Sequence, residues 1–199
     1  MEVIQINQKL QAKDFITIGV YTAIMLVVVM AISMLGFIPI FIPLLTVLVP
    51  LIGGIPFMLY TTKARKFGMT TIMSLLIGLL FTAMGHGIWA IIISLVSGLL
   101  ADLIMKSGNY SSTKKSIMGC SVFFLWIIGN FIPIILTREQ YYLQLVDGGY
   151  GTEYADALMK LIPDWSLLPL TLVTLVFGIL GGMLGKKMLK KHFQRAGMV

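Results

Sequence analysis

The chain has 199 residues, of which 58% are hydrophobic and 12% are charged, and its mean hydropathy is +0.95. No soluble core could bury so much apolar surface in a chain of this length, so the composition excludes the soluble globular classes. The formal net charge of +7 would suggest nucleic acid as the partner of a soluble domain. Here the basic residues flank apolar stretches, so we expect them to lie against anionic lipid and expect no nucleic-acid partner.

Six apolar stretches follow one another along the chain, each close to the length that crosses a bilayer. A helix rises about 1.5 Å per residue, so roughly 20 residues cross a hydrocarbon core about 30 Å thick. We therefore predict an all-α integral membrane protein in which residues 1–199 form a single domain of six transmembrane helices. The predicted spans are residues 15–35, 37–60, 69–85, 88–105, 116–136 and 165–185.

The distribution of Lys and Arg predicts how these spans are oriented. If the N-terminus is cytoplasmic, thirteen of the fifteen basic residues lie inside and only Arg138 and Lys160 lie outside. Cytoplasmic loops carry an excess of Lys and Arg, so we predict that both termini are cytoplasmic and that the loop 137–163 is external. The thirteen inside residues are Lys9, Lys13, Lys63, Arg65, Lys66, Lys106, Lys114, Lys115, Lys186, Lys187, Lys190, Lys191 and Arg195.

Pairs of small residues one helical turn apart occur in three of the spans. Such pairs let two helix backbones approach closely in lipid, where association depends on packing. We expect most of them to pack within the chain. They are Gly19 with Ala23 in the first span, Ser94 with Gly98 in the fourth, and Gly178 with Gly182 and Gly181 with Gly185 in the sixth.

The second span contains prolines, which remove backbone donors and kink helices. We therefore expect this span to be bent or broken, with the freed carbonyls facing protein or a cavity. The prolines are Pro39, Pro43, Pro50 and Pro56.

Ionisable side chains are nearly absent from the spans, which argues against several functions. Asp102 lies one turn before Lys106 at the cytoplasmic end of the fourth span, and we expect an i,i+4 ion pair between them. An ion-driven carrier would need acids near the bilayer midplane, and the sequence has none there. No metalloprotease, nucleophile-elbow or phosphate-loop motif is present either, so we predict that the chain is not an enzyme and has no intrinsic cofactor. If it transports a molecule, a partner supplies the energy.

The loop 137–163 collects polar and aromatic residues. Long loops in compact proteins are usually functional or disordered, and this one is rich in Tyr. Tyrosines suit a lid over a flat organic ligand, because each ring offers apolar area and a hydroxyl. An interfacial aromatic belt is the alternative interpretation. The stretch 154–161 is amphipathic and suits the membrane surface. The four tyrosines are Tyr141, Tyr142, Tyr150 and Tyr154.

Further candidate ligand contacts lie at the outer ends of the spans. His86 sits between Gly85 and Gly87, which permit a tight turn or a close backbone approach to a ligand. Asn130 is an amide at membrane depth that must find a partner on a neighbouring helix or on a substrate. We predict a binding site at the outer ends of spans four to six under the lid. Its candidate residues are His86, Trp89, Asn130, Trp165 and the four lid tyrosines.

Five segments together resemble a known family. The chain resembles the substrate-binding S components of energy-coupling factor (ECF) transporters, in the subgroup called Trep_Strep membrane proteins. The resemblance covers nearly the whole length, although no single motif is a catalytic signature. The segments are KDFITIG at 13–19, KARKFGM at 63–69, GLLADLIMKSG at 98–108, GYGTEYAD at 149–156 and KKMLKKHF at 186–193.

The resemblance implies a six-helix bundle in the bacterial cytoplasmic membrane that binds a vitamin, a related micronutrient or a metal species at its outer face. It also implies partners, namely an ECF T subunit and two ATPase subunits that use ATP. The small-residue motif on the first helix is similar to the surface that contacts the T subunit, and here it corresponds to Gly19 and Ala23. Nickel and cobalt members begin with Met-His, whereas this chain begins Met1-Glu2, so a bare transition metal is not expected.

The substrate stays open at this point. An aromatic lid with few buried charges favours a flat organic ligand, either vitamin-like or haem-like. In the haem case His86, Met84 or a lid tyrosine could approach the iron. The alternatives to an S subunit are a self-sufficient secondary transporter and a membrane assembly or regulatory subunit without a ligand.

Overall fold

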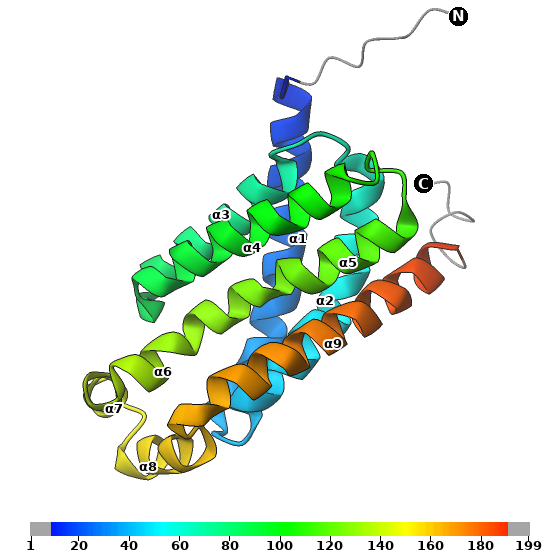
Figure 1. Cartoon of the computed structure of the whole chain (residues 1–199). Coiled ribbons are helices and arrows are strands. Elements are labelled where there is room, and N and C mark those ends of the chain that lie inside the picture. The colour runs from blue at the N-terminus through cyan, green and yellow to red at the C-terminus, as the bar shows by residue number, and fades with distance from the viewer. Residues whose placement is uncertain (1–8, 191–199) are drawn as a thin grey trace, which may run out of the picture.

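Every regular element in residues 9–190, the part of the chain that the computed structural model describes, is a helix (Figure 1). We find no strand in that range. The elements are α1 (Ala12–Ser33), η1 (Met34–Phe37), α2 (Phe41–Lys63), α3 (Met69–Phe81), η2 (Thr82–His86), α4 (Ile88–Lys106), α5 (Thr113–Phe123), η3 (Phe124–Asn130), α6 (Ile132–Leu136), α7 (Arg138–Asp147), α8 (Thr152–Leu161), η4 (Asp164–Ser166) and α9 (Leu167–Met188).

Six helical segments of this range are long and apolar enough to cross a membrane. This confirms the prediction of an all-α protein with six membrane spans, and the bounds differ from the predicted ones by a few residues. The third and fifth spans continue through η2 and through η3 and α6. The segments are Ala12–Phe37, Phe41–Lys63, Met69–His86, Ile88–Lys106, Thr113–Leu136 and Asp164–Met188.

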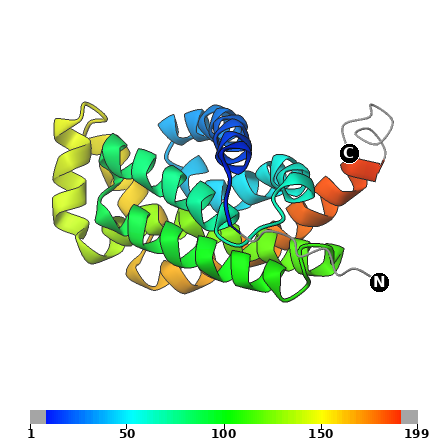
Figure 2. The same cartoon turned by 90° about the horizontal axis from the view of Figure 1, so that it is seen from above.

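Each long helix packs along one or two others, and some of these pairs are far apart in the sequence (Figures 1 and 2). Helix α2 packs against α9, α3 packs against α4, α5 lies between α4 and α9, and α1 contacts α2 and α3. The fifth span is the most enclosed of the six. In its apolar 18-residue stretch 72% of the residues are buried, compared with 28% in the first and the sixth spans. The core therefore centres on this span, where the rings of Phe57 and Phe123 lie 4.5 Å apart.

Helices α2 and α9 touch backbone to backbone. A Cβ placed on Gly54 would lie 2.3 Å from the carbonyl carbon of Gly181, and one on Gly181 would lie 2.0 Å from the carbonyl oxygen of Pro50. The small-residue pairs of the sixth span therefore pack inside the chain, as predicted. Helix α2 continues through Pro50 and Pro56, so the second span is not broken at these prolines, and a bend there stays a prediction. Close packing on α9 and other neighbours holds the helix together where two backbone donors are missing.

The two ends of the bundle differ in chemistry. We call one the basic end, because Lys63, Lys106 and Lys186 lie in the last turns of helices there and Lys66 lies in the α2–α3 turn. We call the other the lid end, because it carries α7 and α8 (Figure 1). Lys191 and Arg195, which were predicted to be cytoplasmic, lie outside the described residues. Met1 and Glu2 lie outside them too. The direction in which the bundle crosses the membrane stays a prediction.

Asp102 is held by long-range contacts at the basic end. Its fully buried carboxyl group accepts hydrogen bonds from Gly68 N (2.8 Å), Thr71 N (3.1 Å) and Thr71 Oγ1 (3.0 Å). It also accepts one from the hydroxyl of Tyr110 at 3.0 Å. The predicted Asp102–Lys106 ion pair is therefore wrong, and the Lys106 ammonium lies 4.8 Å from the centre of the Phe67 ring instead. A buried carboxyl group needs several donors, and here Gly68 before α3, Thr71 in the first turn of α3 and Tyr110 supply them.

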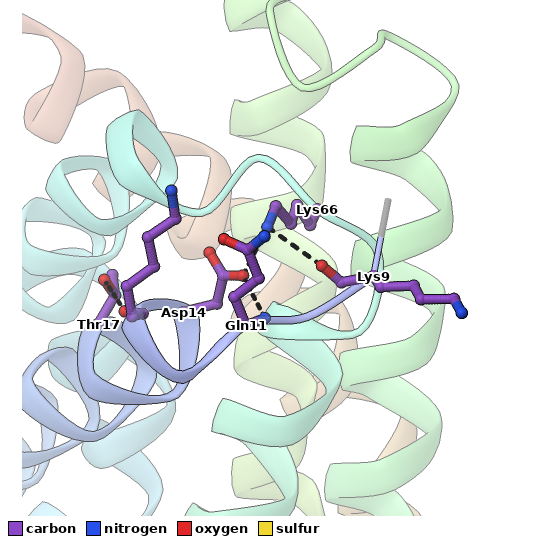
Figure 3. A network of polar contacts seen from close by, with 6 residues as sticks. Lys9, Gln11, Asp14, Thr17 and Lys66 are labelled. Atoms are coloured by element: carbon purple, nitrogen blue, oxygen red, sulfur yellow. Dashed lines mark hydrogen bonds and ion pairs between the residues drawn. The ribbon is translucent and has the colours of Figure 1, made fainter. Parts of the chain in front are cut away.

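The start of α1 is tied to the same turn (Figure 3). Lys66 Nζ lies 2.6 Å from Asp14 Oδ2 and donates to the carbonyl oxygen of Lys9 at 3.2 Å. Asp14 also accepts from Gln11 N at 2.8 Å, which caps the helix. Asp14 thus ties α1 to the α2–α3 turn, and Asp102 ties α4 to the end of the same turn and the start of α3.

Candidate functional site

A cavity of about 300 Å³ lies at the lid end of the bundle. Its walls come from the end of α1 with η1, the first half of α2, η2, η3 and the lid helices. Five of the predicted site residues line it together: His86, Asn130, Tyr141, Tyr150 and Tyr154. A cavity of this size falls at the small end of the range for organic ligands.

His86 owes its place to the two glycines beside it. Gly85 and Gly87 have φ angles of +96° and +81°, a left-handed backbone that glycine adopts without strain. The chain can therefore turn sharply between η2 and α4 and leave the imidazole at the cavity wall. There the ring lies edge-on to Phe81, with 5.1 Å between the ring centres.

The fifth span carries two buried polar groups in the cavity wall, on η3. Trp126 is 1% exposed and Asn130 is 9% exposed. Among the described residues, neither Trp126 Nε1 nor Asn130 Oδ1 finds a hydrogen-bond partner. Buried polar atoms nearly always have one, so this donor and this acceptor are suited to a ligand that fills the cavity.

The fifth span changes its helical conformation in the residues before Pro133. Pro133 has no N–H to donate to the carbonyl of Gly129, four residues earlier, so the regular helical bonding is lost there. The tighter helix of Phe124–Asn130 separates α5 from α6. A 3₁₀ stretch inside a longer helix often marks a functional position. Here it carries the two unpartnered polar side chains that line the cavity, Trp126 and Asn130.

The lid consists of two short helices. The segment 137–163, predicted as a loop, forms α7 and α8, and the amphipathic stretch predicted at 154–161 lies within α8. Gly149 and Gly151, with φ angles of +87° and +84°, make the turn between them. Arg138 fixes the base of the lid by donating to the carbonyl oxygens of Ile162 and Met159 and by pairing with Asp164 at 3.0 Å.

Tyr154 fastens the lid to the first span. Its hydroxyl donates to the carbonyl oxygen of Gly36 at 2.6 Å, and burial raises the pKa of this phenol to about 12, so it stays a donor at neutral pH. The ring of Tyr150 lies 4.9 Å from that of Tyr154 and stacks at 6.5 Å on Phe37. Aromatic rings from α8, the α7–α8 turn and η1 thus cover one side of the cavity.

The lining carries no formal charge apart from what His86 could acquire. No Asp, Glu, Lys or Arg is among the described residues that line the cavity. Within residues 9–190 no three His, Cys, Asp or Glu side chains gather as a metal site. The cavity therefore offers aromatic surface, hydroxyls, an amide, an indole N–H and one imidazole to whatever binds there.

The family is now clear from comparison. The model of a family described as "Hypothetical bacterial integral membrane protein (Trep_Strep)" matches residues 12–195. The chain belongs to the Trep_Strep family. The match includes all six candidate spans and the lid, and the protein is a multi-pass integral membrane protein. Comparison with curated proteins and with solved structures gives no match.

Three of the predicted site residues of this Trep_Strep protein do not line the cavity. Trp89 is half-buried on α4, with its carbonyl oxygen against Gly129, and Trp165 in η4 is 72% exposed. Tyr142 interacts with Asp156 on α8. The cavity lies against the first, second, third and fifth spans and the lid, and none of its described lining residues is on α4 or α9.

Sequence reasoning missed the contribution of the first span. Met30, Ser33 and Phe37 line the cavity, and Gly36 receives the hydrogen bond from the lid. No sequence signal marks these residues, because their role depends on where the lid folds back. Trp126 had a signal, since a tryptophan four residues before Asn130 falls on the same helical face.

The small residues of α1 face away from the rest of the Trep_Strep chain. Gly19 and Ala23 are exposed, and a Cβ placed on Gly19 would meet nothing within 4 Å. Ile16, Val20 and Val27 on the same helix are more than half exposed. By contrast, a Cβ on any of Gly98, Gly178, Gly181, Gly182 or Gly185 would approach a neighbouring helix within 3.4 Å.

Proposed function

We propose that this Trep_Strep protein is the substrate-binding S subunit of an ECF-type importer in the bacterial cytoplasmic membrane. It captures a small flat organic micronutrient at the outer face, and partner subunits use ATP to drive uptake. The chain itself is neither an enzyme nor the holder of a cofactor. The observation that carries this proposal is the lidded cavity with two buried polar atoms that have no partner among the described residues.

The lining favours a neutral, vitamin-like ligand. Trp126 Nε1 offers a donor and Asn130 Oδ1 an acceptor, so a heterocycle that carries both an acceptor and an N–H or O–H donor would satisfy the pair. The rings of Phe81, Tyr141 and Tyr154 offer stacking area. A buried carboxylate or ammonium of the ligand would have no partner of opposite charge in this lining.

Haem is the second ligand class, because His86 reaches the cavity and an imidazole is a common axial ligand of haem iron. The carboxylates of haem would then have to stay outside the lining, which contains no Lys or Arg. This difference in charge ranks haem behind a neutral heterocycle.

The outward face of α1 supports the partner part of the proposal. A pair of small residues lets another helix approach closely, and Gly19 and Ala23 are exposed among large apolar side chains. This face therefore suits the transmembrane T subunit, through which two ATPase subunits act. Lipid alone would also cover such a face, so the partner must be tested directly.

The test is mass spectrometry of small molecules that co-purify with the protein from bacterial membranes. We expect one organic species in wild type and its loss in a variant in which both Trp126→Phe and Asn130→Ala are present. The matched control is Trp165→Phe, which alters an exposed tryptophan of the same end. Equal retention in both variants would contradict the cavity as the ligand site.

His86→Ala separates the two ligand classes. If the ligand is haem, this variant loses the absorption bands of the axially ligated iron. If it is a neutral heterocycle, the variant keeps the ligand with a modest loss of affinity. The dependence on partner subunits is tested by comparing uptake in cells that express a T subunit and the ATPases with uptake in cells that lack them. Uptake that does not depend on those subunits would favour a self-sufficient transporter.

A further inference from the structure

A second cavity, of about 430 Å³, lies at the basic end of the bundle, at the opposite end of the spans from the lid. It is formed by the end of α2, the α4–α5 turn, the start of α5 and the end of α9. We call it the basic pocket. Its lining residues include Arg65, Lys186 and Lys190 together with the hydroxyl residues Thr61, Thr113 and Ser116.

Positive charge in the basic pocket is uncompensated within the described residues. The ion pairs of that range are Lys66–Asp14 and Arg138–Asp164, and neither involves Arg65, Lys186 or Lys190. No Asp or Glu is among the described lining residues. Three cations that share one cavity repel each other, and a bound anion would remove that repulsion.

Tyr110 separates the pocket from the nearest buried acid. Its hydroxyl donates to Asp102 at 3.0 Å, and burial raises the pKa of this phenol, so the donor is kept. Tyr110 lines the basic pocket and has a φ of +52°, a left-handed conformation that is uncommon for a bulky residue. Such backbone outliers gather at functional sites, where the surroundings hold them in place.

An apolar strip leads from the pocket along the outside of α9. Ile179 and Met183 lie on the same helical face as Lys186 and Lys190, since these positions are three or four residues apart. Ile179 is 42% exposed and Met183 is 54% exposed. The basic pocket lies where the spans end, which is the level of lipid headgroups, and the strip continues toward the apolar centre of the spans.

We propose that the basic pocket binds the phosphate group of an anionic phospholipid, with one acyl chain lying along Ile179 and Met183. Basic pockets between transmembrane helices bind lipid headgroups in this manner, because guanidinium and ammonium groups pair with phosphate oxygens. Free phosphate shares the headgroup chemistry but would leave the apolar strip unused. The site is distinct from the lidded cavity and does not depend on the proposed import function.

The test uses the purified full-length protein in detergent with phosphatidylglycerol, measured by native mass spectrometry. The pocket variant carries Arg65→Gln and Lys186→Gln. The matched control carries Lys63→Gln and Lys187→Gln, which remove equal charge at positions one or two residues away that do not line the pocket. The pocket variant loses both the general attraction of two basic side chains for anionic lipid and their pairing with the phosphate, so we expect at least about 30-fold weaker lipid retention. The control loses only the general attraction, so it should retain the lipid clearly better than the pocket variant does.

Several outcomes would overturn this proposal. Equal losses in the two variants would mean general attraction to anionic lipid. Equal retention of phosphatidylcholine and phosphatidylglycerol by wild type would show that net charge does not matter. Displacement of the lipid by millimolar inorganic phosphate would identify free phosphate as the occupant. Wild-type lipid retention by the pocket variant, together with loss of a co-purifying protein, would assign the surface to a protein partner. Thermal melting of both variants checks that they fold, and the changed side chains are exposed in each case.

Discussion

The hydrogen bond from Tyr154 to Gly36 gives the sharpest prediction, because it joins the lid to the first span. The Tyr154→Phe variant keeps the ring and its contact with Tyr150 but removes the donor. The carbonyl of the buried Gly36 is then left without this partner, which costs about 1–3 kcal/mol. Tyr154 is only half-buried, so we take the lower part, about 1–1.5 kcal/mol. That corresponds to about 5- to 12-fold in the equilibrium for opening the lid.

Hydrogen–deuterium exchange of the amides in α8 (Thr152–Leu161) measures this equilibrium, because exchange follows local opening. We expect those amides to exchange about 5- to 12-fold faster in Tyr154→Phe, with α2 and α9 unchanged. Since burial raises the pKa of Tyr154 to about 12, the bond is present at neutral pH and is lost only as the pH rises through that value.

The matched control is Tyr142→Phe, which deletes a hydroxyl that interacts with Asp156 inside the lid and not with α1. It should leave the exchange of α8 close to that of wild type. If Tyr154→Phe exchanges like wild type, the hydroxyl does not hold the lid closed. If both variants speed exchange equally, the effect belongs to the lid itself and the argument from Gly36 fails.

Three further predictions concern binding, packing and orientation. Asn130→Ala should weaken binding of the co-purifying ligand about 5- to 150-fold, measured by titration, because a polar group of the ligand loses its partner. Gly181→Leu should lower the melting temperature sharply, because a Cβ there would lie 2.0 Å from a carbonyl oxygen of α2. Gly19→Leu, where a Cβ meets nothing within 4 Å, should melt as wild type does but lose co-purification with a T subunit. Single cysteines at Ser111 and Asp147 should differ in labelling by an impermeant thiol reagent in intact cells, and equal labelling would refute the predicted orientation.

The spans could be predicted from sequence because bilayer thickness fixes their length. Each is a run of about 20 apolar residues, and no tertiary information is needed to recognise it. The small-residue motifs were harder, since the same pattern permits close approach of any helix. Gly178 with Gly182 meets α5 inside the chain, whereas Gly19 with Ala23 meets none of the described chain. The motif indicates that a backbone can come close, and only the arrangement of the other helices determines which one does.

The predicted details that proved wrong all depended on local reasoning where distant contacts decide. Asp102 was expected to pair with Lys106 one turn away, but it accepts four hydrogen bonds from Gly68, Thr71 and Tyr110. A buried carboxyl group surrounded by donors is far better stabilised than an interfacial pair, which contributes at most about 1 kcal/mol. Helix α7 (Arg138–Asp147) was missed because polar and aromatic residues dominate it, and Arg138 anchors it only after the chain has folded back.

Helix α1 connects the features on which the proposed function rests. It begins at the Asp14–Lys66 pair, shows Gly19 to the outside, and continues into η1, where Gly36 holds the lid. Ala12–Ser33 is one uninterrupted helix, and packed helices shift as rigid bodies rather than deform. A partner that displaced this helix would therefore move the cavity wall and the acceptor of Tyr154 together. Contact of a partner with the outward face of α1 and closure of the lid would then be linked through this one helix.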